Sequence, residues 1–178
     1  FDVIKYPIIP LKSKGDYHNL RWNEGVISND QGSVTTPLYL KNGVIKDDNI
    51  KQFFTSQEYA VIGSSTNRSK FGNKVLRCYQ QHNKIVHPVN PKEKIIEGVS
   101  CITKFSDLPG AVVSISIVTP PKVTENIVEQ AIGHGIKNIW MQPGSESTLA
   151  IQLCRDNNIN IIANGPCILV ELGFIDSK

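Results

Sequence analysis

The chain has 178 residues, with 19 lysines and arginines against 16 acidic residues, a formal net charge of +3. This length suffices for one well-filled core, and apolar and charged fractions of 40% and 20% exclude a chain disordered by composition. The mild charge argues against a duplex nucleic-acid partner, and no apolar stretch is long enough to span a bilayer. We therefore expect neither nucleic-acid nor membrane interaction.

Residues 1–46 differ from the rest of the chain in their pattern of apolar residues. Glycines and prolines interrupt every short apolar run in this segment, which predicts loops and short strands. We expect an irregular N-terminal extension, residues 1–46, followed by a single domain at residues 47–178. The extension could dock a partner or support a homo-oligomer, and the sequence leaves this open.

From Asp47 onward, strand-like and helix-like stretches alternate. Asp47 or Asp48 is expected to cap a short helix that carries Ile50, Phe53 and Phe54 on one face. Strands are expected at residues 59–62, 84–89, 111–118, 138–141 and 160–163. Helices are expected at residues 71–81, after Pro121, after Ser145 or Ser147, and near the C-terminus. This alternation predicts the α/β class: a Rossmann-like three-layer domain with a parallel sheet of about five strands.

The junction after the first expected strand is the most informative segment. The apolar run breaks at Gly63 into Ser-Ser-Thr-Asn-Arg-Ser-Lys-Phe and reaches Gly72, where a helical pattern begins. The first N–H groups of a helix have no partner within it, and the helix dipole adds partial positive charge. Arg68 and Lys70 add two full charges. The junction therefore predicts a nucleotide or pyrophosphate ligand.

A parallel sheet binds its ligand beyond the carboxyl ends of its strands. Four loops are expected at this edge, at residues 63–72, 90–94, 119–122 and 142–145. They are scattered along the chain, and the fold is expected to gather them on one rim.

The loop after the first strand departs from the dinucleotide fingerprint Gly-x-Gly-x-x-Gly. Read from Gly63, the chain has Ser65 and Arg68 where the second and third glycines belong. The second strand has no carboxylate beyond it until Glu93, whereas Lys92 suits a phosphorylated ribose. An NAD(P)-dependent oxidoreductase or a nicotinamide redox sensor stays the alternative to a coenzyme A ligand.

Six segments, in order along residues 47–175, resemble the small CoA-binding-domain proteins. They are Val61-Ile-Gly-Ser-Ser, Lys70-Phe-Gly-Asn-Lys-Val-Leu, Val89-Asn-Pro-Lys, Val118-Thr-Pro-Pro-Lys-Val-Thr, Ile139-Trp-Met-Gln-Pro-Gly and Asn164-Gly-Pro-Cys. That family consists of Rossmann-like single domains similar to the N-terminal domain of the succinyl-CoA synthetase alpha subunit.

The resemblance implies a site for coenzyme A. The first loop would approach the phosphates, the second the ribose phosphate, the third would form a flat apolar wall, and the fourth would line the far edge. The implied residues are Gly63, Ser64, Ser65, Arg68, Lys70, Phe71, Gly72, Asn73, Asn90, Pro91, Lys92, Thr119, Pro120, Pro121, Pro143 and Gly144. Coenzyme A carries about four negative charges, which Arg68, Lys70, Lys92 and Lys122 would complement.

Catalytic groups are not evident at the expected rim. We find no paired carboxylates, no Ser/His/Asp arrangement, no metal-ligand spacing and no P-loop lysine at Gly72-Asn-Lys-Val. The synthetase's phosphorylated histidine belongs to a further domain that these motifs do not reach. We therefore expect non-catalytic binding of coenzyme A or a short acyl-CoA, and not an enzyme.

The cysteines fit a cytoplasmic protein. Cys78, Cys101, Cys154 and Cys167 form no Cys-x-x-Cys pair, so we expect reduced thiols rather than a zinc or redox motif. Cys167 follows the last strand close to a helix start, where a thiol pKa can fall. A mixed disulfide of Cys167 with the coenzyme A thiol is one hypothesis, and a buried apolar thiol is the simpler one.

Overall fold

The computed structural model describes residues 44–176, with side chains from residue 48 onward, and the compact unit considered below begins at Gln52. The predicted extension, residues 1–46, falls almost entirely outside the described residues, so its boundary stays a prediction. The elements, in chain order, are α2 (Val44–Phe53), β1 (Glu58–Ile62), α3 (Phe71–Gln81), β2 (Ile85–Val89), β3 (Ile95–Ile96), β4 (Val99–Ser100), η1 (Phe105–Asp107), β5 (Val112–Ile117), α4 (Pro121–His134), β6 (Asn138–Met141), α5 (Thr148–Asp156), β7 (Asn160–Ile162) and α6 (Ile168–Leu172).

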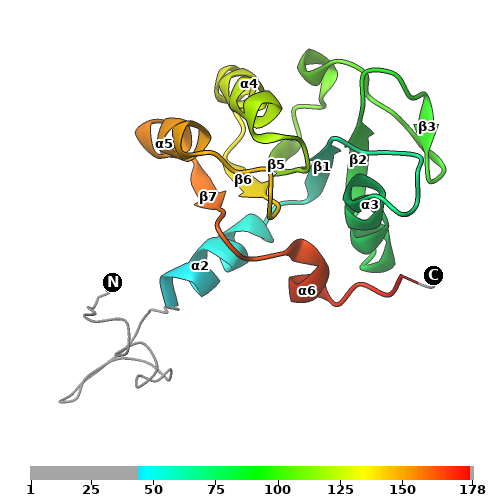
Figure 1. Cartoon of the computed structure of the whole chain (residues 1–178), viewed down its shortest axis with the longest axis horizontal. Helices are drawn as coiled ribbons and strands as arrows, with labels where there is room; N and C mark the ends of the chain where they lie inside the picture. The colour runs from blue at the N-terminus through cyan, green and yellow to red at the C-terminus, as the bar shows by residue number, and fades with distance from the viewer. Residues whose placement is uncertain (1–43, 177–178) are drawn as a thin grey trace. The chain divides into compact units, whose positions relative to one another are not determined.

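Five strands form one parallel sheet in the order β2-β1-β5-β6-β7. Figure 1 shows α4 and α5 on one face of this sheet and α3 and α6 on the other. The predicted Rossmann-like three-layer domain is therefore confirmed. From β1 the chain proceeds outward to β2, and from β5 it proceeds in the opposite direction to β6 and β7. The loops after β1 and β5 consequently flank the point where the strand order reverses, which is where such sheets bind ligands.

The middle strand β5 is covered on both faces, as its sequence Val-Val-Ser-Ile-Ser-Ile indicates. Ser114 and Ser116 are fully buried, and each hydroxyl has a partner. The Ser116 hydroxyl lies 2.7 Å from the Tyr79 hydroxyl, and Ser114 Oγ lies 2.5 Å from Ser56 Oγ. Buried polar groups are tolerated when they are hydrogen-bonded, so these serines do not interrupt the core.

Aromatic side chains pack together against one face of the sheet. The Phe53 ring meets Trp140 edge-on at 5.2 Å, and Tyr59 stacks on Tyr79 at 5.1 Å. Trp140 is fully buried, and its indole N–H donates to the carbonyl of Pro166 at 3.0 Å. These contacts hold α3 and the segment after β7 against the sheet.

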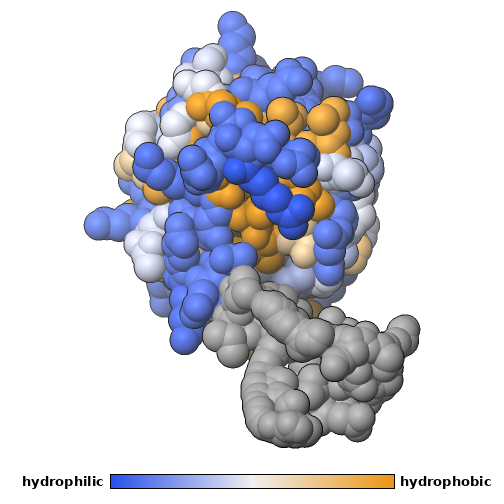
Figure 2. Space-filling view, turned by 90° about the vertical axis from the view of Figure 1, so that its left-hand side faces the viewer, coloured by the Kyte–Doolittle hydropathy of each residue, from blue (hydrophilic) through white to orange (hydrophobic). Residues whose placement is uncertain are grey.

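The two outer strands of the sheet differ. Beyond β2, the Ile102 N–H donates to the carbonyl of Pro88 at 2.9 Å, and Pro88 itself has no N–H that would require a partner. On the other side, β7 is the outermost of the described strands. Figure 2 looks onto the side of the molecule that carries α5 and β7, and it shows apolar surface bordered by hydrophilic residues.

Two expectations from the sequence were wrong or incomplete. The first helix begins at Val44, so Asp47 and Asp48 lie inside it and neither is its N-cap. Aspartate is also favourable in a first helical turn, so the residue type alone does not mark the start. The β3–β4 hairpin was missed, because strands of two residues are too short to show a periodic pattern. No helix in the described part of the chain is long and apolar enough to cross a membrane.

Candidate functional site

Two glycines bring the end of β1, the start of α3 and the loop after β5 into contact. Gly63 has φ of +94°, and a Cβ atom there would lie 2.9 Å from the carbonyl oxygen of Val118. A Cβ atom on Gly72 would lie 2.1 Å from the carbonyl oxygen of Gly63. Only glycine fits at either position. The first and third predicted loops therefore meet through their backbones.

The second loop is fastened to the first by hydrogen bonds. The N–H groups of Gly63 and Ser64 donate to the carbonyl of Val89 at 3.1 and 3.2 Å. Asn90 Nδ2 donates to the carbonyl of Ser64 at 2.7 Å, while Asn90 Oδ1 accepts from the N–H of Lys92 at 2.7 Å. Asn90 is thus a structural tie between the loops, and this leaves Lys92 exposed at the rim.

The fourth loop is fastened to the third. The Gln142 N–H donates to the carbonyl of Ile117 at 3.0 Å, and the Ser145 hydroxyl donates to the same carbonyl at 2.8 Å. The third loop ends in Pro120, the N-cap of α4, with Pro121 at its first turn. All four loops predicted from the sequence therefore lie at the carboxyl edge of the sheet. Whether their residues hold a ligand stays a prediction.

The start of α3 has no side-chain cap, and its N-cap residue is exposed. Lys70 is its N-cap residue and forms no side-chain cap hydrogen bond, and the first turn contains no acidic residue. Phe71 is 60% exposed, and Lys70 is exposed beside it. A helix start without a capping side chain leaves its first N–H groups to water or to an anion, and the dipole favours negative charge there.

The Glu97 carboxylate lies beside this helix start and was not foreseen. It comes from the turn between β3 and β4, where Glu97 and Gly98 have φ of +49° and +80°. One carboxylate oxygen forms an ion pair with Arg68, and the other accepts from Asn73 Nδ2 at 3.0 Å. The Asn73 hydrogen bond, and then Arg68, lower the pKa of Glu97. The sequence signal of such a turn is a glycine, Gly98, between two short strand-like stretches.

A buried arginine supports the first loop from behind. The Arg77 side chain is 5% exposed, and Nε donates to Asn73 Oδ1 at 2.7 Å. Its Nη2 donates to the carbonyl of Arg68 at 3.0 Å and to Asp176 Oδ1 at 3.1 Å. Arg77 thus joins the loop, the helix and the C-terminal segment. It occurs in the middle of a helical pattern, where the sequence alone does not distinguish a buried arginine from an exposed one.

The third and fourth loops have a different charge from the first and second. Lys122 is 91% exposed and lies 3.2 Å from Glu125, whose carboxylate also accepts from Ser147 Oγ at 2.8 Å. The Gly144 N–H donates to Glu146 Oε1 at 2.6 Å. Thr119 Oγ1 lies 2.8 Å from Thr124 Oγ1. Of the four predicted cations, Arg68 and Lys122 therefore have carboxylate partners, whereas Lys70 and Lys92 are exposed beside the first and second loops.

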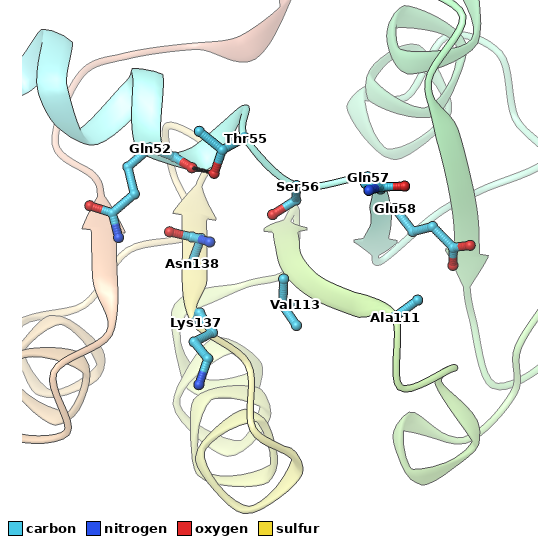
Figure 3. A pocket seen from close by; sticks show the side chains of 9 residues that line it. All are labelled: Gln52, Thr55, Ser56, Gln57, Glu58, Ala111, Val113, Lys137 and Asn138. Atoms are coloured by element: carbon cyan, nitrogen blue, oxygen red, sulfur yellow. Dashed lines mark hydrogen bonds between the residues drawn. The ribbon is translucent and has the colours of Figure 1, made fainter.

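A cavity of about 640 Å³ lies at the opposite, amino edge of the sheet (Figure 3). Polar side chains surround the amino ends of β1, β5 and β6 there. The lining residues are Gln52, Thr55, Ser56, Gln57, Glu58, Ala111, Val113, Lys137 and Asn138. Lys137 is the one basic side chain in this lining, and no helix begins at it. The cavity therefore lacks the features that recognise a polyphosphate.

Residues 57–173 match the family described as CoA binding domain. The chain belongs to this family. The match covers the sheet, all four loops at the carboxyl edge and the β3–β4 hairpin, so the resemblance seen in the six sequence segments is confirmed. Within the described residues of this CoA-binding-domain protein, no group of three or more His, Cys, Asp or Glu side chains could hold a metal ion.

Known proteins similar to this CoA-binding-domain protein are of two kinds. An 88-residue segment is 30% identical to the alpha subunit of an ADP-forming acetate–CoA ligase II from Pyrococcus furiosus, and it covers 49% of the chain but 19% of that subunit. A conserved hypothetical protein from P. furiosus has 35% identity and a TM-score of 0.62, covering 65% of this chain and 98% of that one. A hypothetical protein from Pyrococcus horikoshii has 27% identity and a TM-score of 0.67, covering 79% and 96%.

Proposed function

We propose that the protein binds coenzyme A or a short acyl-CoA at the carboxyl edge of its sheet, and that it does so without catalysing a reaction on it. The observation that carries this proposal is the meeting of Gly63, Gly72 and Thr119 at the uncapped start of α3. Membership of the CoA-binding domain family and the similarity to an acetate–CoA ligase subunit support the same ligand.

The distribution of charge supports one orientation of the ligand. The first and second loops have Arg68, Lys70, Lys92 and Lys94 against Glu93 and the nearby Glu97, whereas the third and fourth loops have Lys122 against Glu125 and Glu146. Phosphates would bind on the basic side, because opposite charges attract and the helix dipole adds to the attraction. The uncharged pantetheine arm would then extend toward Thr119, Pro120 and Pro121.

The environment of Cys167 distinguishes the two hypotheses for its thiol. Its sulfur accepts a hydrogen bond from Gln142 Nε2 at 3.3 Å, and the residue is only partly buried. It is therefore not the fully buried apolar thiol that the simpler hypothesis expects. A mixed disulfide with the coenzyme A thiol stays a prediction. Mass spectrometry after diamide treatment with coenzyme A would locate any adduct.

Isothermal titration with coenzyme A and dephospho-coenzyme A tests the proposal. We expect coenzyme A to bind more tightly, and Lys92→Gln to remove about a tenfold advantage, the effect of one lost charge-assisted contact. Lys137→Gln, which removes a cation at the amino edge, is the matched control and should leave both affinities unchanged. Equal, negligible heats for the two compounds would refute the proposal, whereas tighter binding of NADPH would favour the nicotinamide alternative. Acetyl-CoA should be recovered unchanged.

A further inference from the structure

The Glu97 carboxylate is an anion of the protein's own at the place proposed for the ligand's phosphates. One of its oxygens forms an ion pair with Arg68, and the other accepts a hydrogen bond from Asn73 Nδ2 at 3.0 Å. Asn73 stands in the first turn of α3, and Arg68 belongs to the loop that precedes this turn. The carboxylate therefore takes the loop arginine as an ion partner, as a phosphate group would, and it also accepts from a side-chain amide of the first helical turn.

Several contacts hold Glu97 in this position. Its backbone is in the left-handed region at the tip of the β3–β4 hairpin, and its carbonyl accepts from Gln80 Nε2 at 3.1 Å. The side chain is 17% exposed. Asn73 is itself fixed, because its Oδ1 accepts from Arg77 and its Nδ2 also donates to the carbonyl of Ser65 at 2.8 Å. The carboxylate is thus part of an ordered network and not a freely moving surface group.

Of the cations near the start of α3, Arg68 is the one that Glu97 already holds, while Lys70 is exposed beside it. Lys74 and Arg77 both pair with Asp176, at 3.1 Å each, and Arg77 is buried. The Arg68 side chain is 51% exposed, so an incoming anion can reach it. A phosphate that approaches the start of α3 meets the exposed Lys70 and one guanidinium already paired with the Glu97 carboxylate. The carboxylate and the phosphate repel each other, because like charges close together do.

We propose that Glu97 is an internal competitor for the phosphate and sets the affinity and selectivity of the site by holding Arg68. This inference rests on the proposed function, since it concerns the same loop. Binding is an exchange of ion partners: the ligand's phosphate takes over the Arg68 guanidinium, and Glu97 keeps Asn73 or turns to solvent. Ligands whose phosphates do not reach Arg68 leave its ion pair with Glu97 intact, so they gain no binding free energy from Arg68.

A double-mutant cycle on the full chain tests the exchange. The variants are Glu97→Gln, Arg68→Gln and the double variant, with Glu129→Gln on the exposed middle of α4 as the control for net charge. Glutamine keeps one acceptor oxygen for Asn73 and replaces the oxygen that pairs with Arg68 by an uncharged NH2 group. Coenzyme A and inorganic pyrophosphate are titrated into each variant, and circular dichroism checks that each is folded.

We expect Glu97→Gln to tighten coenzyme A binding about tenfold, as removal of one nearby negative charge does. The gain should disappear when Arg68 is also replaced, and Glu129→Gln should change affinity less than twofold. Unchanged or weaker binding by Glu97→Gln, while the natural chain binds coenzyme A, overturns this inference and leaves the proposed function standing. An equal gain in affinity with and without Arg68 also overturns it, because repulsion between the Glu97 carboxylate and the phosphate would then explain the gain.

Pyrophosphate separates the two proposals. If no variant binds coenzyme A but Glu97→Gln tightens pyrophosphate through Arg68, the competition is upheld and the coenzyme A function fails. If no variant binds either compound, both proposals fail.

Discussion

The two edges of the parallel sheet are built from different contacts. At the carboxyl edge, Gly63 and Gly72 remove side chains so that three backbone segments can meet at a helix start. At the amino edge, a chain of polar side chains links the strands. Asn160 Nδ2 donates to Asn138 at 3.0 Å, Asn138 Nδ2 donates to Ser114 at 2.9 Å, and Ser114 contacts Ser56.

The cavity and the uncapped helix start therefore lie at opposite edges of the sheet. The amino edge has the cavity of about 640 Å³, and hydrogen bonds link Asn160, Asn138 and Ser114 beside it. The carboxyl edge instead has a helix start without a side-chain cap, and exposed lysines beside it. The amino edge therefore contributes to stability, and we assign recognition to the carboxyl edge.

The largest expected effect comes from Gly72→Ala. Its Cβ would overlap the carbonyl oxygen of Gly63, and both are backbone positions that cannot move independently. We expect a loss of about 3 kcal/mol in the free energy of unfolding and loss of coenzyme A binding. Urea denaturation and calorimetric titration measure the two effects.

Gly133→Ala is the matched control for this change. Gly133 lies within α4 and has open space around the added atom, so the variant should be as stable as the natural chain or slightly more stable. If Gly72→Ala binds coenzyme A normally, the close backbone contact is not needed for the site.

An intermediate effect is expected from Asn138→Ala at the amino edge. The buried amide connects Ser114 with Asn160, so its removal leaves polar groups without partners and should cost about 2 kcal/mol in unfolding free energy. The dissociation constant for coenzyme A should stay within about twofold, because the change lies at the far end of the strands. A large loss of affinity in a folded Asn138→Ala protein would contradict the division between the edges.

The smallest expected effect is an acid dependence of stability from the carboxyl edge. The pKa of Glu97 is lowered from its ordinary 4.5 by Asn73 and Arg68. A carboxylate with a lowered folded-state pKa stabilises the protein fully above its unfolded-state pKa and loses this contribution as the pH falls through the folded-state value. Stability should therefore decline below about pH 4.5 less steeply in Glu97→Gln than in the natural chain. Identical acid limbs in thermal melts would show that the ion pair adds no stability.

Much of the fold followed from local patterns. The helix predicted at residues 71–81 and the strand at residues 138–141 match α3 and β6, because one-sided apolar spacing and an unbroken apolar run are strong signals. The strands predicted at residues 111–118 and 160–163 extend only one residue beyond β5 and β7 at the ends where they differ. The start of α2 was placed wrongly, because aspartate is favourable both as an N-cap and in the first turn. The β3–β4 hairpin was missed, because two-residue strands show no periodic pattern.

The sequence by itself determined the order of strands and helices, the loops at the carboxyl edge and the two glycines that shape them, because these depend on spacing and residue type. Only the tertiary structure decided which charges act there. Glu97 lies 29 residues from Arg68 along the chain, and Asp176 lies 99 residues from Arg77. Their pairing depends on how the hairpin and the C-terminal segment pack on α3, and no local pattern contains that information.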